Sequence, residues 1–188
     1  MPHPHIWPAI IGAGVGMAVL VWACMWLVRR WEGMTPRTRW TWFALIAVLE
    51  AGYWLNVYAW LIEPNLLVVQ RVEIVSEDWH GAPLTIAAIG DTHVGSPHVD
   101  AARMGRIVAR VNELRPELVV LLGDYVGFHA PAAERSPAEN REIIGGIATF
   151  AALVSRYGAV AVIGNHDVWY DCQAVTTALQ EAGVGTLW

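Results

Sequence analysis

The chain contains two long apolar stretches, followed by shorter apolar runs that alternate with amphipathic segments. Residues 6–28 carry no charged side chain over 23 positions, and residues 40–62 form a second apolar stretch with aromatic residues at both ends. Each stretch is long enough to cross a hydrocarbon layer of about 30 Å as a helix. The pattern predicts a membrane anchor with two transmembrane helices in residues 1–65 and a separate domain in residues 66–188.

Charged residues indicate how such an anchor would be oriented. Arg29, Arg30, Arg37 and Arg39 lie in the short loop between the two apolar stretches, whereas the N-terminal flank has no Arg. Because Arg-rich loops stay in the cytoplasm, we expect the following domain on the far side of the membrane. Glu50 lies within the second stretch, so a helix in the membrane interface is the alternative to a span there.

Short apolar runs continue through the second part of the chain. Residues 66–75 are strand-like, and the runs at residues 85–89, 118–122 and 159–163 are typical of buried parallel strands. The next apolar residues, from Val184 onward, begin a fourth strand. Because helical segments separate these runs, we expect an α/β fold with parallel strands and right-handed crossovers.

Three helices are predicted between the strands. Asp100 is a suitable N-cap for a helix with apolar residues at helical spacing up to Leu114. The segment from Ser136 has the spacing of a capping box, and we expect its helix to end at Gly158. A third helix is expected from about Asp171 to Ala182.

Polar residues follow the end of each of the three central strands. Since the carboxyl ends of parallel strands lie at one edge of a sheet, these side chains are expected to share one site. Their oxygen and imidazole donors suit Mn, Fe or Zn. A turn residue or a helix N-cap is the alternative for any one of them. The residues are Asp91 and His93 after the first strand, Asp124 after the second, and Asn165, His166 and Asp167 after the third.

These residues resemble a known family. Gly90-Asp91-x-His93, Gly123-Asp124 and Gly164-Asn165-His166-Asp167 are similar, in this order, to the first three motifs of the calcineurin-like metallophosphoesterases. The resemblance covers about residues 83–188 and is greatest to the membrane-anchored bacterial branch. It implies the N-terminal half of a metallophosphoesterase-type α/β/β/α sandwich, preceded here by a transmembrane helical hairpin.

The resemblance also implies a binuclear centre with two divalent metal ions. Asp91 and His93 would bind one ion, Asp124 would bridge the two, and Asn165 would bind the second. The activity implied is hydrolysis of a phosphate ester or pyrophosphate by a metal-activated water.

Two further residues would act on the substrate rather than on the metals. The resemblance implies that His166 faces the scissile phosphate as proton donor or charge stabiliser, and that Asp167 orients its ring. Two other histidines near the motifs, His98 and His129, are candidate contacts to the substrate phosphate.

The chain departs from the family pattern in two places. Gly127 stands where the second motif often has a second Asp, and the later Gly-His and Gly-His-x-His motifs do not occur before Trp188. We therefore expect a fragment of a longer phosphoesterase that lacks the C-terminal metal ligands and leaves an apolar sheet face exposed. The alternative is a noncatalytic membrane protein whose partial phosphoesterase half serves binding or structure.

Composition narrows the expected partners. The formal net charge is −5, with twelve Arg and no Lys, which argues against nucleic acid as a partner. Membrane lipid is the expected partner of the apolar stretches. The expected substrate is a phosphoester that is lipid-linked or derived from the cell envelope. The expected location is the bacterial inner membrane, multi-pass, with the domain on the periplasmic or extracellular side.

Overall fold

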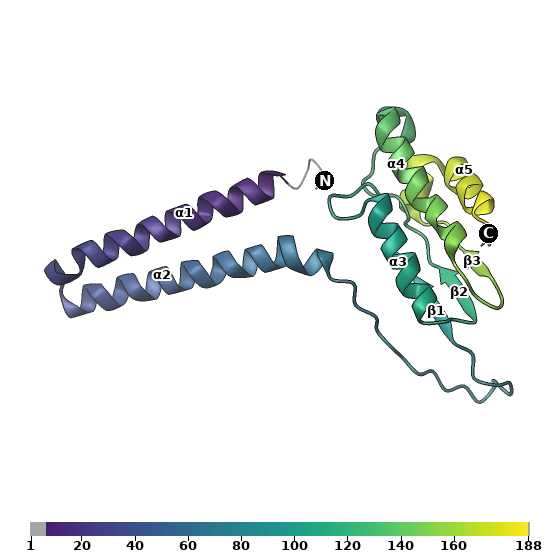
Figure 1. The fold of residues 1–188 in the computed structure, drawn as a ribbon, viewed down its shortest axis with the longest axis horizontal. Coiled ribbons are helices and arrows are strands. Elements are labelled where there is room, and N and C mark those ends of the chain that lie inside the picture. Colours follow the sequence, from purple (N-terminus) through teal and green to yellow (C-terminus); the bar gives the residue numbers. More distant parts are fainter. Residues whose placement is uncertain (1–6, 188) are drawn as a thin grey trace. The chain divides into compact units, whose positions relative to one another are not determined.

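A membrane-type hairpin forms the first of two units. The computed structural model describes residues 7–187, and the first unit ends at Val68. Helices α1 (Trp7–Arg30) and α2 (Pro36–Val57) form an antiparallel pair (Figure 1), joined by a 3₁₀ turn at Trp31–Gly33. Helix α2 continues through a π-helical turn, Tyr58–Ile62, and a 3₁₀ turn, Glu63–Asn65. By length and composition, both helices are suited to cross a membrane, so the predicted helical hairpin is confirmed.

The two helices contact each other through small and polar residues. The Tyr53 hydroxyl donates a hydrogen bond to the Ala13 carbonyl, 2.7 Å away. A Cβ at Gly16 would lie 3.0 Å from the Tyr53 ring, so this glycine lets the ring approach closely. The Cys24 thiol lies 3.9 Å from a carboxylate oxygen of Glu50, which places the acidic side chain against the other helix.

A parallel four-stranded sheet is the centre of the second unit, which begins at Val69. The strands follow chain order across the sheet and are β1 (Ile86–Ile89), β2 (Leu118–Leu121), β3 (Ala159–Ala161) and β4 (Gly185–Thr186). Every neighbouring pair is parallel. The predicted α/β fold is therefore confirmed, and the ends of β1, β2 and β3 lie at one edge.

Helices connect successive strands and begin largely where the sequence predicts. In α3 (Ala101–Glu113), Asp100 accepts a hydrogen bond from Arg103 N at 2.6 Å. In α4 (Pro137–Ala148), Ser136 and Glu139 form the expected capping box. The expected end at Gly158 is wrong, because Ala148 is followed by a 3₁₀ turn, Thr149–Ala152, and Leu153 is then extended.

Helix α5 (Asn165–Glu181) consists of two segments. Asp171 has non-helical dihedral angles (φ −177°, ψ 96°), and its side chain accepts a hydrogen bond from Ala174 N at 3.0 Å. It therefore caps the second segment, which corresponds to the predicted third helix. The first segment was not predicted, and it contains Asn165, His166 and Asp167.

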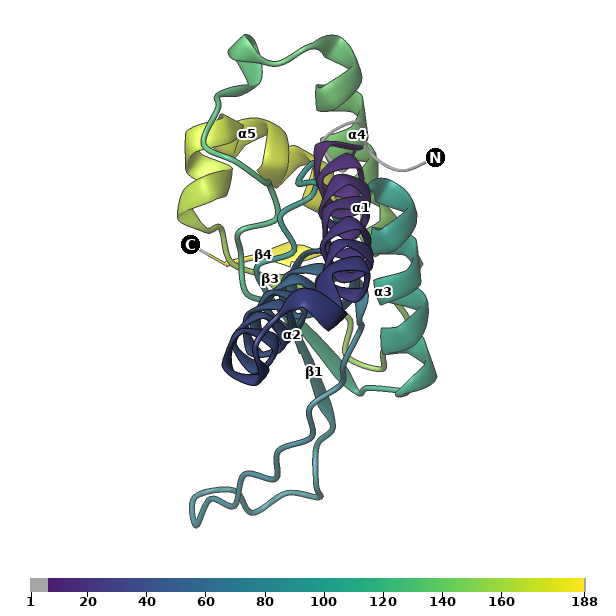
Figure 2. The ribbon, with the colours of Figure 1, turned by 90° about the vertical axis from the view of Figure 1, so that its left-hand side faces the viewer.

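Among the described residues of the second unit, helices cover one face of the sheet. Helices α3 and α4 lie along the same side of the strands (Figure 2), and Val119 and Leu121 of β2 are buried in the core that they form. Leu122 and Ile86 are 58% and 51% exposed. The expected exposed apolar face is thus present among the described residues.

The segment before β1 differs from the prediction. Residues 66–75 are extended but do not form a strand, and Val72, Ile74 and Val75 are exposed. The sequence pattern is that of a strand, but a strand also requires a hydrogen-bonded neighbour, and no described segment pairs with it.

Candidate metal centre

Three of the predicted ligands occupy a rare backbone conformation. Asp91, His93 and Asp124 have φ angles of 51°, 47° and 54°, in the left-handed region that non-glycine residues seldom adopt. Such conformations cost on the order of 1 kcal/mol or more each and persist where the surroundings enforce them. Here Asp91 N donates to Gly123 O, and His93 N to Asp124 O, each at 3.1 Å. The loops after β1 and β2 are therefore joined directly to each other.

Asp167 fixes the second of these loops to the start of α5. Its side chain is fully buried, at 0% exposure. One carboxylate oxygen accepts hydrogen bonds from Tyr125 N and Val126 N at 2.8 and 3.1 Å, and the other from Asp124 N and Gly164 N, both at 2.9 Å. Burial raises the pKa of this carboxyl, and the four N–H donors oppose that shift because they stabilise the charged form.

The same contacts leave no room for a side chain at residue 164. A Cβ there would lie 2.1 Å from a carboxylate oxygen of Asp124, which also accepts a hydrogen bond from His166 N at 3.0 Å. The glycine of the third motif therefore permits a close approach between the loops after β2 and β3.

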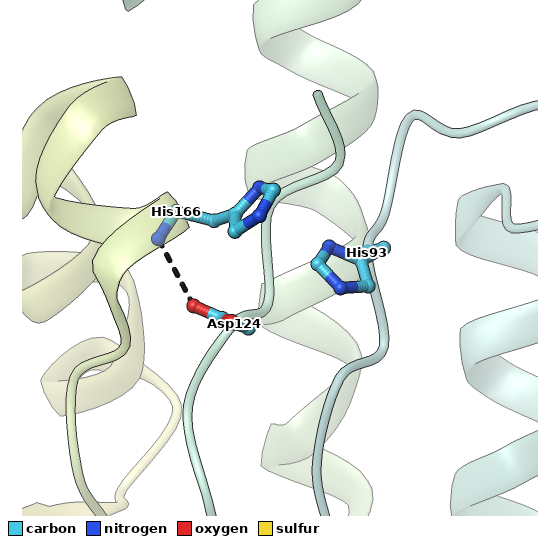
Figure 3. Close-up of side chains that lie close together, drawn as sticks. All are labelled: His93, Asp124 and His166. Carbon is cyan, nitrogen blue, oxygen red and sulfur yellow. Dashed lines mark hydrogen bonds between the residues drawn. The ribbon is translucent and has the colours of Figure 1, made fainter. Parts of the chain in front are cut away.

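These loops bring three side chains together. One ligand atom each of His93, Asp124 and His166 lies within 4.8 Å of the others (Figure 3), and all three residues are half-buried. The rings of His93 and His166 have centroids 4.6 Å apart. Two imidazole nitrogens and a carboxylate oxygen at this spacing are a donor set that suits a divalent metal ion such as Zn²⁺, Fe²⁺ or Mn²⁺.

Backbone carbonyls orient both imidazole rings. His93 Nδ1 lies 3.2 Å from Val126 O, and His166 Nδ1 lies 3.2 Å from Phe128 O. Because a carbonyl only accepts hydrogen bonds, each Nδ1 carries the proton of the neutral ring. Nε2 of each ring is then left for a metal ion or a substrate.

Two other predicted ligands lie outside this group. The side chain of Asp91 is 80% exposed, and its carboxylate lies 3.7 Å from His93 Nε2, so a small rotation would let both bind one ion. Asn165 is the first residue of α5 and is exposed. It is adjacent in sequence to His166.

The position of Asp167 differs from the role that the family resemblance implied. Both of its oxygens accept hydrogen bonds from backbone N–H groups, whereas the His166 ring is held by Phe128 O. The carboxylate of Asp167 therefore orients the loop that carries Asp124 rather than the imidazole ring.

Tyr125 and Trp169 were not recognised from the sequence. Tyr125 is fully buried; its hydroxyl accepts from Gly123 N at 3.2 Å and donates to Val162 O at 2.8 Å, and burial raises its pKa. Trp169 contacts the rings of His166 and His129, with centroids 5.0 and 4.9 Å away. The spacing of three residues between His166 and Trp169 on a helix is the signal that would have identified this contact.

The other loop histidine, His98, has a different environment from His129. Burial, together with the charge of Arg103, lowers the pKa of His98 and favours its neutral form. Its Nδ1 is buried and, among the described residues, has no hydrogen-bond partner. His129 is exposed and lies beside His166, with ring centroids 4.6 Å apart. Of the two, His129 is thus the one that the structure places at the site.

Comparisons with known proteins identify a family and a relative. A family model described as calcineurin-like phosphoesterase matches residues 84–183. A zebrafish (Danio rerio) protein named "Transmembrane protein with metallophosphoesterase domain" is 33% identical over 98 residues, which cover 52% of this chain. The match spans 20% of the length of that relative. No solved structure gives a significant match.

The role of Asp167 is testable by removing only its charge. In Asp167→Asn, an amide N–H would meet backbone N–H donors, so we expect the free energy of unfolding to fall by about 3 kcal/mol. Asp171→Asn on the same helix is the control, because Asn caps helices as well as Asp does, and we expect a change below about 0.5 kcal/mol. Urea denaturation followed by amide hydrogen exchange measures the free energy of unfolding of both variants. Equal losses of stability in the two variants would contradict the role assigned to Asp167.

Proposed function

The chain belongs to the calcineurin-like phosphoesterase family, and we propose that it is a membrane-anchored, metal-dependent hydrolase of a phosphate ester or pyrophosphate. The family match and the membrane-protein relative support the general activity and the membrane association. The observation that carries the proposal is the convergence of His93, Asp124 and His166 at the ends of three strands.

In this proposal two divalent metal ions, Mn, Fe or Zn, bind at the strand ends. His93, through Nε2, and Asp91 would hold one ion, Asp124 would serve both, and Asn165 would contribute to the second. The 3.7 Å separation of His93 Nε2 and the Asp91 carboxylate supports the first pair. When bound, the ions would supply Lewis-acid chemistry that activates water and stabilises charge on phosphorus.

His166 is proposed as the group that faces the scissile phosphate. Its Nδ1 proton is held by Phe128 O, and its backbone N–H donates to Asp124, so the ring has a fixed orientation beside the metal-binding carboxylate. In the doubly protonated ring, Nε2 would carry the proton that passes to the leaving oxygen, while the Nδ1 proton stays bonded to Phe128 O. The residue acts by general acid catalysis, and Asp167 acts indirectly by holding the loop.

The substrate is proposed to be a lipid-linked or envelope-derived phosphoester. The two membrane-type helices support an anchor in the bacterial inner membrane. The Arg residues at the adjoining ends of these helices, two in α1 and two in α2, support a cytoplasmic loop and a domain on the periplasmic or extracellular side. The net charge of −5 supports a substrate other than nucleic acid.

Asp124→Asn tests the proposed metal centre. We expect loss of bound metal and at least a 100-fold lower kcat/KM on aryl phosphomonoesters or phosphodiesters, because a neutral amide cannot bridge two cations as a carboxylate does. Metal content by mass spectrometry and hydrolysis by product absorbance are the measurements. Asp78→Asn, which removes the same charge from the exposed linker, is the control. Unchanged metal content in Asp124→Asn would overturn the proposal.

Replacing the four loop arginines, Arg29, Arg30, Arg37 and Arg39, tests the orientation. With all four changed to Gln, we expect a mixed orientation, because the charge bias that retains the loop in the cytoplasm is lost. Protease added to bacterial spheroplasts should digest the domain in all molecules of the unmodified chain but in only a fraction of the variant molecules. The four-Lys variant keeps the charge and should behave like the unmodified chain. Full protection of the unmodified domain would show that it is cytoplasmic.

A further inference from the structure

A row of four rings leads from the candidate metal centre to the surface. His93 contacts His166, with centroids 4.6 Å apart, and His166 contacts His129 at 4.6 Å and Trp169 at 5.0 Å. His129 and Trp169 are 4.9 Å apart, so the last three rings form a closed cluster. One side of His166 thus faces the metal-ligand group, and two further rings flank it.

The outer part of this cluster is open to solvent. Trp169 is 47% exposed, and His129 is also exposed. An exposed Trp leaves much apolar area in water, and a site of this kind beside catalytic groups is typical of ligand contact. The His129 ring contacts those of His166 and Trp169, and the residue remains exposed, so one part of the cluster faces solvent.

The position of the cluster identifies the part of the substrate that it would contact. This step rests on the proposed function, in which His166 protonates the leaving oxygen. The leaving group then lies next to the His166 ring, where His129 and Trp169 are its neighbours. These two residues therefore border the leaving group rather than the phosphoryl group.

The chemistry of the cluster favours an apolar group. Arg135, the cation that follows the His129 loop, donates hydrogen bonds to the carbonyls of Ala130 at 2.9 Å and Gly127 at 2.6 Å. Its guanidinium also lies over the Tyr170 ring, 5.4 Å from the centroid. The guanidinium of Arg135 is thus engaged in stabilising the loop.

We propose that Trp169 and His129, with His166, form a subsite for a flat, apolar leaving group, so that the preferred substrate is a phosphoester of an aromatic or otherwise unsaturated apolar alcohol. Trp169 stacks on the leaving group, and His129 borders it. The shared chemistry is a π-bearing apolar group, which either an aryl ester or an isoprenoid ester provides.

The test compares pairs of substrates in one enzyme. Phenyl and 2-naphthyl phosphate have the same reacting bond and differ in ring area. We expect the chain to favour the naphthyl ester in kcat/KM by about three- to tenfold, the range for one aromatic contact. This ratio should fall to about one in Trp169→Ala and be partly retained in Trp169→Phe. Val168→Ala, at the neighbouring exposed position, should keep the ratio.

A binding measurement separates this proposal from the proposed function. Calorimetry measures the affinity for two non-hydrolysable analogues, phenylmethyl phosphonate and 2-naphthylmethyl phosphonate. The chain should bind the naphthyl compound more tightly, and Trp169→Ala should lose this preference, whether or not the esters are hydrolysed. A comparison of kcat/KM for farnesyl phosphate and ethyl phosphate shows whether the subsite favours an isoprenoid group as well as an aryl group. A naphthyl-to-phenyl ratio of one in the unmodified chain, or a ratio unchanged by Trp169→Ala, overturns the subsite. A preference for inorganic pyrophosphate over the naphthyl ester also overturns it.

Discussion

The buried carboxylate of Asp167 is the contact on which the arrangement of the site depends. It accepts four backbone hydrogen bonds, three from residues 124–126 and one from Gly164. A fully buried charge is tolerated only when it is compensated in this way, so neither loop can move without leaving the charge or the donors unpaired. The left-handed conformation of Asp124 is maintained by this constraint.

From this constraint follows the geometry of the functional groups. The start of α5 is held against the loop after β2, which places His166 N on the Asp124 carboxylate and the His166 ring beside His93. The loop after β1 is then joined through the hydrogen bond from His93 N to Asp124 O. Three strand ends thus act as one rigid support, and a metal ion or a phosphate would meet groups that are already oriented. The exposed Trp169 ring packs beside His166 at the outer end of this support.

Much of this organisation is visible in the sequence, and the rest depends on contacts between distant residues. The strands that begin after Thr85 and that end before Gly123 and Gly164 could be predicted, because buried parallel strands are apolar runs in the sequence. The polar residues at their carboxyl ends must then lie at one edge of the sheet. Helix starts at Asp100 and Ser136 follow local capping rules. The role of Asp167 could not be predicted, since three of its four backbone partners lie 41 to 43 residues earlier along the chain. The extended segment 66–75 shows the converse, because an apolar pattern does not supply a partner strand.

The strand ends are proposed to bind a catalytic metal ion, and the position of a bound ion can be determined by crystallography. Crystals of the chain grown with Mn²⁺ would show the ion by anomalous scattering. We expect an anomalous peak in bonding contact with His93 Nε2 and the Asp124 carboxylate, beside the His166 ring. A structure with Mn²⁺ present and no peak between these side chains, or with peaks only elsewhere on the surface, would contradict this proposal.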